Sequence, residues 1–152
     1  MTIDKRHVKS IGDISTIGFG SMGISEFYGQ TDESEAVKAI LLAIDNGINH
    51  FDTADGYAFG DNEIFLGKHL ELSNHIKRQK IIIASKASIL RDRNDPSVRG
   101  ICIKPSYLKK QLLRSLKNLN TDYLDIFYIH RLPPNATDKE LLELSIFLNE
   151  IK

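Results

Sequence analysis

The chain has little of several features that would fix its class at once. It has one cysteine among 152 residues, Cys102, which excludes an internal disulfide scaffold and a cysteine-rich metal cluster. Its 20 Lys and Arg balance its 20 Asp and Glu, so the basic excess typical of nucleic-acid-binding domains is absent. No run of 18 apolar residues is present, and the N-terminus lacks the apolar core of a signal peptide. We therefore expect a cytoplasmic protein with no metal centre, no nucleic-acid partner and no membrane anchor.

The composition that is present is that of a globular domain. Hydrophobic residues make up 41% of the chain and charged residues 26%, which is typical of a single soluble domain and unlike a disordered chain. The length is shorter than the roughly 200 to 400 residues of a complete (β/α)8 barrel. Length therefore limits which parallel architectures the chain can form alone.

Strand and helix patterns alternate along the sequence. Strands are predicted at residues 14–20, 48–51, 81–84 and 123–129, and helices at 32–47, 62–72, from 106 onward and from 137 onward. A long polar loop is expected over residues 91–104. Asp32 with Glu35, and Thr137 with Glu140, have the spacing of capping boxes, and Gly47 fits a helix end. This alternation predicts parallel strands joined by helical crossovers.

Two parallel architectures fit this order of elements: a doubly wound open sheet and part of a barrel. The segment Gly18-Phe19-Gly20-Ser21-Met22-Gly23 has the letters of the dinucleotide-binding pattern. That pattern requires a helix to begin directly after the glycines, and no helix pattern follows here. We interpret the match as coincidental.

Polar side chains follow three successive predicted strands. Asp52, Lys86 and His130 each lie where a strand ends, and Tyr57 lies in the loop just after Asp52. Taken singly, such residues are commonly helix caps, solvated cations or packing side chains. The carboxyl ends of parallel strands are where α/β proteins bind ligands, so the four together predict a site.

These side-chain types fit the proton-coupled reduction of a carbonyl group. A phenol has an ordinary pKa of about 10, and a lysine cation beside a phenol favours the phenolate and lowers that pKa. A carboxylate keeps such a lysine charged, and an imidazole can hold the carbonyl oxygen by a hydrogen bond. None of these groups supplies a hydride, so the reaction requires a nicotinamide or similar cofactor.

At these residues the chain resembles the aldo-keto reductases, in particular the branch of aryl-alcohol dehydrogenases and perakine reductase. The resemblance rests on the interval of five from Asp52 to Tyr57 and on motifs at residues 18–29, 47–57, 62–67, 84–86, 94–101 and 115–131. It implies an α/β fold that is a TIM (β/α)8-barrel fragment containing about the first four βα units. Residues 1–152 would then form the N-terminal half of the barrel domain.

The resemblance also implies roles for individual residues. Tyr57 would be the general acid, Lys86 would tune its pKa, and Asp52 would pair with Lys86. The cofactor would be NADPH, and the substrate an aldehyde or ketone. The expected contacts are Gly20, Ser21, Met22 and Asp52 for NADPH, and Tyr28, Phe59, His130 and Arg131 for the substrate, which His130 would orient.

Two other functions stay open at this stage. The chain could be a non-catalytic interaction subunit, since some members of the family are channel-associated regulatory subunits, or it could be an inactive remnant. A half-barrel has two open sheet edges, and its inward apolar groups at residues 81–84 and 123–129 would lack cover. We therefore expect association with a complementary half-barrel or with a second copy of the chain.

Overall fold

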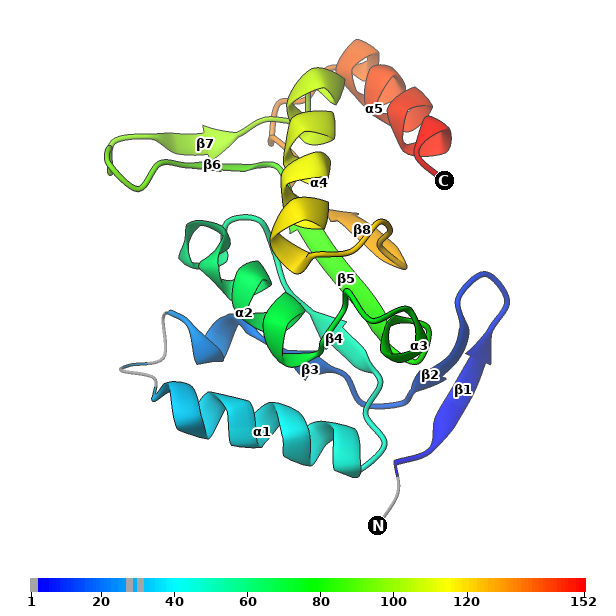
Figure 1. Cartoon of the computed structure of the whole chain (residues 1–152). Coiled ribbons are helices and arrows are strands. Elements are labelled where there is room, and N and C mark those ends of the chain that lie inside the picture. The colour runs from blue at the N-terminus through cyan, green and yellow to red at the C-terminus, as the bar shows by residue number, and fades with distance from the viewer. Residues whose placement is uncertain (1–2, 27–28, 30–31) are drawn as a thin grey trace.

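The centre of the protein is a four-stranded parallel sheet with the strand order β3-β4-β5-β8 (Figure 1). The computed structural model describes residues 3–26, 29 and 32–152. The strands are β3 (Phe19–Gly20), β4 (His50–Asp52), β5 (Ile82–Ala87) and β8 (Ile126–Ile129). Each neighbouring pair is parallel, which confirms the predicted alternation of strands and helical crossovers.

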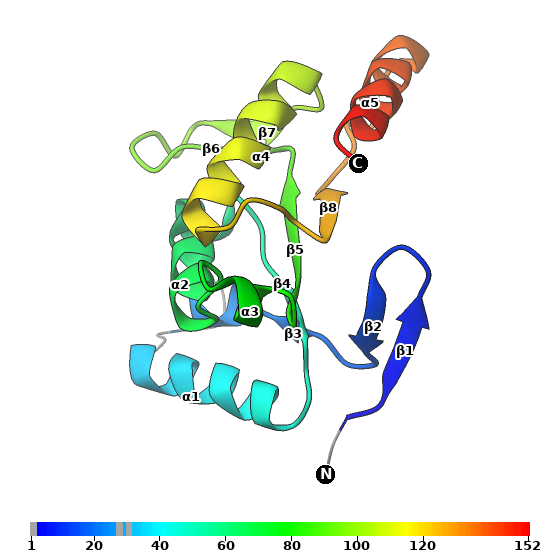
Figure 2. The same ribbon diagram turned by 45° about the vertical axis from the view of Figure 1, so that its right-hand side comes forward.

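Helices cover one side of the parallel sheet. They are α1 (Glu33–Asp45), α2 (Asp61–His69), α3 (His75–Arg78), α4 (Pro105–Leu119) and α5 (Asp138–Glu150). Figure 2 shows α1, α2, α3 and α4 on the same side of the strands. This is the single helical layer expected of consecutive βα units.

The helix ends follow the capping signals of the sequence. The Asp32 carboxylate accepts hydrogen bonds from the backbone of Ser34 and Glu35 at the start of α1, although the Glu35 side chain pairs with a lysine and does not close a capping box. Thr137 and Glu140 form a complete capping box at the start of α5. Gly47, with φ of 89°, follows the end of α1 as predicted.

Two apolar clusters hold the helices on the sheet. The larger cluster joins α1, α2 and α4 to β4 and β5, and its fully buried members are Ile40, Phe51, Leu66, Ile83 and Leu119. The second cluster joins α4 and α5 near the ends of β5 and β8, and its buried members are Ala87, Ile103, Leu108, Leu144 and Phe147. These clusters fix the carboxyl ends of the strands relative to the helices that follow them.

Helices α2 and α4 approach each other closely at Gly67. A Cβ atom built on Gly67 would lie 2.6 Å from the carbonyl carbon of Leu119 and 2.8 Å from its Cα. Real Cβ contacts are not that short, so a side chain at this position requires the α4 backbone to move.

Replacing Gly67 with alanine is therefore expected to destabilise the protein by about 1–3 kcal/mol, the usual cost of overpacking. Helix propensity alone favours alanine over glycine by about 1 kcal/mol, so the expected sign is opposite to that of an exposed helical glycine. Urea unfolding followed by circular dichroism measures the effect. Lys68→Ala, at the exposed neighbouring position in α2, is the control and should change stability by no more than about 0.5 kcal/mol. An unchanged or raised stability of Gly67→Ala would contradict the close approach.

Two antiparallel hairpins differ from the sequence-based prediction. β1 (Lys5–Val8) pairs with β2 (Gly12–Ser15), and β6 (Ile89–Arg91) pairs with β7 (Arg99–Ile101). The single strand predicted at residues 14–20 is wrong, because its first part belongs to β2 and its last part to β3. The predicted loop at 91–104 is partly a hairpin. β1 is exposed throughout, and β6 has only two apolar residues, Ile89 and Leu90, next to each other. The hairpin strands therefore lack the apolar alternation on which strand prediction depends.

Several other boundaries also differ. α2 ends at His69 and not at 72, and Glu71 adopts φ of 52°, which a continuing helix does not allow. The short helix α3 then follows and was not predicted. The fourth parallel strand begins at Ile126, three residues later than predicted.

The expected exposure of the inward apolar groups is only partly observed. Ile82 is 6% exposed and Ala84 is fully buried, so the expectation is wrong for β5, which has neighbouring strands on both sides. β8 pairs with one strand only in the described part of the chain, and its Tyr128 is 43% exposed. The exposed inward side chain therefore lies on β8, one of the two edge strands.

Candidate active site

Four predicted site residues meet at the carboxyl edge of the parallel sheet. Asp52 ends β4, Lys86 lies near the end of β5, and His130 directly follows β8. The backbone N–H of His130 donates to the carbonyl oxygen of Ala87 at 2.8 Å, and this hydrogen bond fixes the start of the loop after β8. Tyr57 begins the 3-10 turn η2 (Tyr57–Gly60), in the loop that follows β4.

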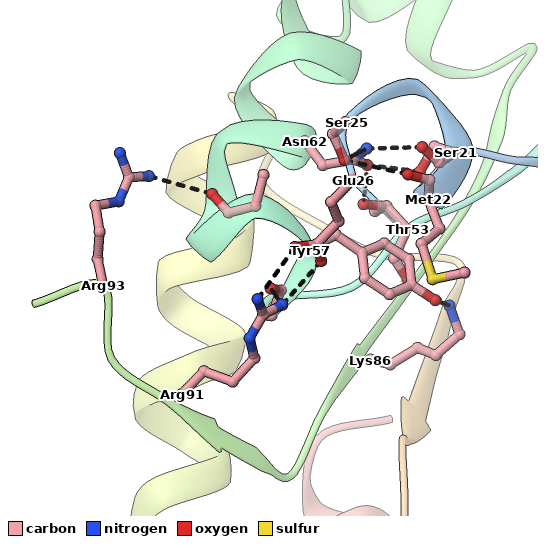
Figure 3. A network of polar contacts seen from close by, with 12 residues as sticks. Ser21, Met22, Ser25, Glu26, Thr53, Tyr57, Asn62, Lys86, Arg91 and Arg93 are labelled. Atoms are coloured by element: carbon pink, nitrogen blue, oxygen red, sulfur yellow. Dashed lines mark hydrogen bonds and ion pairs between the residues drawn. The ribbon is translucent and has the colours of Figure 1, made fainter. Parts of the chain in front are cut away.

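The Lys86 ammonium group links three of these elements (Figure 3). It forms an ion pair with the Asp52 carboxylate and donates to the carbonyl oxygen of Thr53 at 2.7 Å. Its Nζ lies 3.4 Å from the Tyr57 hydroxyl oxygen. The Lys86 side chain is 15% exposed, so these contacts are made largely away from bulk water. The cation is therefore held by a carboxylate and directed at the phenol.

His130 lies against the same phenol. The Tyr57 and His130 rings are 5.7 Å apart between centroids, with an interplanar angle of 82°. Burial lowers the pKa of His130 below its ordinary value, and the Lys86 and Arg131 cations lower it further. The ring is therefore neutral at pH 7, with one N–H to donate. Its buried Nδ1 has no hydrogen-bond partner among the described residues.

A pocket of about 530 Å³ lies over these rings. Its lining residues are Met22, Gly56, Tyr57, Ile89, Arg91, Arg99, His130 and Arg131. Of the predicted substrate contacts, His130 and Arg131 line this pocket. Phe59 is not among its lining residues, and its ring lies against the guanidinium groups of Arg91 and Arg93. Tyr28 lies outside the described residues.

The predicted cofactor-binding turn after β3 divides into exposed and buried residues. Met22 lines the pocket, and nothing lies within 4 Å of a Cβ built on Gly20. Ser21 is fully buried, and its hydroxyl lies 2.8 Å from the Asp52 carbonyl oxygen and 2.6 Å from the Asn62 side-chain oxygen. The Ser21 side chain therefore supports the turn from inside, and the contact of this turn with a cofactor stays a prediction.

The partner of Ser21, Asn62, is a buried residue whose structural role was not predicted. Its amide nitrogen donates to the Ser21 carbonyl oxygen at 2.8 Å and to the Ser25 hydroxyl at 2.7 Å. Its side-chain oxygen accepts from Thr53 at 2.7 Å. Asn62 thus ties the start of α2 to the ends of β3 and β4. The sequence shows only an asparagine in a motif, with no sign of these long-range partners.

The backbone after Tyr57 runs through the left-handed region. Ala58 has φ of 45° and Phe59 has φ of 57°, and Gly60 follows with φ of 98°. Each non-glycine residue in this conformation costs about 1–3 kcal/mol, which surrounding contacts must offset. The loop that presents Tyr57 is therefore held by its neighbours and not by its own backbone preference.

Behind this loop lies a buried acidic pair. Asp55 is 4% exposed and Glu63 is fully buried. Burial, with the nearby charge of Glu63, raises the pKa of Asp55 to about 7. The native state then holds a proton that the unfolded chain releases near pH 4. The contribution of this protonated site to the free energy of unfolding should accordingly be full below about pH 4 and be lost as pH rises through about 7.

The Asp55→Asn variant is expected to remove much of this pH dependence. At about pH 8 it should be more stable than the parent by about 1–2 kcal/mol, and near pH 5 the difference should shrink, because the parent is then largely protonated at this site. Urea unfolding measured across this range checks the prediction. Asp122→Asn, at an exposed position, is the control and should leave the pH profile unchanged. A parallel pH profile for Asp55→Asn would contradict the raised pKa.

The chain also matches a known protein family. A profile described as the Aldo/keto reductase family matches residues 16–152. The chain is a member of the aldo/keto reductase family. Membership confirms the family resemblance seen in the sequence.

Individual aldo/keto reductases support this membership. The protein named "Probable aldo-keto reductase 1" from Glycine max is 34% identical over 143 residues, which cover 92% of this chain and 40% of that protein. Aldo-keto reductase yakc of Schizosaccharomyces pombe, whose name specifies NADP(+), is 35% identical over 121 residues, covering 78% of this chain and 34% of that protein. The chain therefore spans less than half the length of these curated relatives.

A solved structure confirms the fold. The holo form of aldo-keto reductase AKR11C1 from Bacillus halodurans superposes with a TM-score of 0.79 at 31% identity, covering 97% of this chain and 47% of that one. Together with the parallel sheet and its helical layer, this identifies the fold as an α/β fragment of the family barrel. In the described ranges, every helix is too short or too polar to cross a bilayer.

Proposed function

We propose that this chain is the N-terminal half, residues 1–152, of an NADPH-dependent reductase of aldehydes or ketones. The observation that supports this most directly is the Lys86 ammonium group, which lies between the Asp52 carboxylate and the Tyr57 hydroxyl beside a pocket. A structural ion pair needs no phenol directed at its cation. A proton donor does, because the cation stabilises the phenolate that remains after the transfer.

In the proposed reaction Tyr57 donates its hydroxyl proton to the carbonyl oxygen of the substrate. Lys86 stabilises the resulting phenolate by its positive charge, and Asp52 keeps Lys86 charged and directed. The neutral His130 ring donates its N–H to the same carbonyl oxygen and so holds it beside the phenol. Arg131 forms part of the substrate pocket wall.

The residues at this edge fit the nicotinamide end of NADPH. Met22 offers an apolar wall next to Tyr57, and the open space at Gly20 allows close approach to the backbone. Asp52 lies between this turn and Lys86, within reach of a ribose. Bound there, NADPH would supply the hydride that the carbonyl carbon accepts. The NADP(+) in the name of the yeast relative supports this choice of cofactor.

We also propose that the complete reaction uses more than this chain alone. The relatives are more than twice as long, and β3 and β8 each have one strand neighbour in the described part of the chain. A complementary half-barrel, or a second copy of this chain, would cover those edges. The cytoplasmic location expected from the sequence stays a prediction.

The proposed function is tested by mixing the chain with NADPH and benzaldehyde, alone and with a separately produced C-terminal half of the Glycine max relative. We expect NADPH consumption that depends on the aldehyde and increases when the second half is added. Cofactor binding can be followed by the change in NADPH fluorescence as the chain is titrated. The absence of both binding and consumption in both mixtures would overturn the proposal.

A further inference from the structure

The loop that presents Tyr57 is held from outside by three arginines. Each guanidinium group donates to a backbone carbonyl oxygen of the loop. The pairs are Arg91 with Gly56 at 2.6 Å, Arg93 with Ala58 at 3.2 Å, and Arg114 with Phe59. Hydrogen bonds from a charged donor are stronger than those between neutral groups, so they favour the left-handed loop over relaxed alternatives.

Arg91 is the most highly connected of the three (Figure 3). It forms a forked ion pair with Glu26, with nitrogen–oxygen distances of 2.8 and 3.1 Å. Both side chains are largely buried, at 19% and 16% exposed. The guanidinium carbon also lies 4.4 Å from the centre of the Phe59 ring. Arg91 thus joins the loop after β3, the loop after β4 and the end of β6.

The Gly56 carbonyl is directly linked to the backbone of Tyr57. The Gly56 carbonyl and the Tyr57 N–H belong to one planar peptide group, so an arginine that holds one fixes the other. The Tyr57 N–H in turn donates to Ala54 at 3.1 Å. The same residue carries the hydroxyl that lies 3.4 Å from Lys86, so a turn of this peptide group would move the backbone from which the phenol projects.

We propose that Arg91 is a positioning residue for the reaction, which holds the Tyr57 loop in the orientation that places the phenol beside Lys86. Glu26 acts through Arg91, because its carboxylate holds the Arg91 guanidinium group in place. The effect on turnover rests on the proposed reductase function, whereas the effect on the loop does not. The two parts can therefore be tested separately.

A different explanation for any loss of activity must be separated from this one. Arg91 also lines the pocket, so its removal changes the pocket charge. Arg99 lines the same pocket, and its guanidinium group bonds within the described chain to Val98 of its own hairpin. Arg99→Met therefore removes the same charge from the same pocket without touching the Tyr57 loop, and it is the matched control for Arg91→Met.

The first experiment measures amide hydrogen exchange by NMR on the full chain and needs no activity. In Arg91→Met we expect protection of the Tyr57 and Phe59 amides to fall about tenfold or more, because the contacts that hold the loop closed are lost. Protection at Ile83 in β5 should stay unchanged. The ring resonances of Tyr57, which the His130 ring shifts, should move toward random-coil values. Unchanged loop protection, or an equal loss in Arg99→Met, would overturn the proposal.

The second experiment measures kinetics with the complemented chain. We expect Arg91→Met to lower kcat by about ten- to a hundredfold with little change in KM, because the phenol and not the substrate is displaced. Glu26→Gln should show a smaller loss, and Arg91→Lys should recover part of the rate. A change in KM alone would assign Arg91 to substrate binding and overturn the positioning role. If the parent shows neither NADPH binding nor turnover, the proposed function fails, and the exchange experiment still decides the loop part.

Discussion

Replacing Tyr57 with phenylalanine is expected to lower kcat for carbonyl reduction by about 10²–10⁴-fold, the usual contribution of a positioned general acid. The substitution removes one oxygen atom and keeps the ring that packs edge-on against His130. NADPH affinity should change little, because the phenol is proposed to give its proton to the substrate. Steady-state kinetics of the complemented chain, with a separate NADPH titration, measure the two quantities.

The control for this variant is Tyr123→Phe. Tyr123 precedes β8, is 40% exposed, and contacts Arg78 through its ring, which the substitution keeps. It should leave kcat unchanged. A Tyr57→Phe variant with the parent rate would show that another group supplies the proton, while equal losses in both variants would point to damaged folding and not to lost proton transfer.

Replacing Arg78 with methionine is expected to destabilise the protein by about 3–5 kcal/mol, because it leaves a largely buried carboxylate without its partner. Arg78 is 2% exposed and its ion pair with Asp125 is 2.8 Å long. Three further acceptors lose their donor: the Thr121 hydroxyl at 2.9 Å and the carbonyl oxygens of Ile81 and Tyr123 at 2.7 and 3.0 Å. Urea unfolding followed by circular dichroism measures the loss.

Two controls separate the buried pair from simple charge loss. Lys77→Met removes the neighbouring cation, which pairs with Glu71 at the surface, and should cost no more than about 1 kcal/mol. Adding Asp125→Asn to Arg78→Met should recover part of the stability, because the orphaned charge is then gone. An Arg78→Met variant as stable as Lys77→Met would contradict the importance of this ion pair.

The site could be predicted where it depends on local order. Asp52, Lys86 and His130 each follow a strand pattern, and parallel strands bring their carboxyl ends to one edge whatever the details of packing. The interval of five from Asp52 to Tyr57, which the chain shares with the family it resembles, then indicates which loop residue joins them. For the same reason the four parallel strands could be expected before their registers were known.

The supports of the site could not be predicted, because their partners are distant in sequence. Arg91 and Glu26 are 65 residues apart, and residues 91–100 are mostly polar and resemble any surface loop. Ser21 and Asn62 are 41 residues apart, so the burial that removes Ser21 from the pocket depends on how α2 packs. Periodicity reports which face of an element is apolar, and it does not report which polar groups meet.

The strand order also bears on how the protein folds. Phe19 pairs with Phe51, and Phe51 pairs with Ile83, so each new strand joins the one made just before it. Each pairing closes the chain segment between two neighbouring strands into a loop. The entropy lost in closing a loop grows only with the logarithm of its length, so the entropic costs of the successive pairings are similar. The sheet can therefore assemble strand by strand as the chain is synthesised. In that order of assembly, Asp52 and Lys86 can form their ion pair once β4 and β5 have paired. His130 joins the site later, when β8 is added to the sheet.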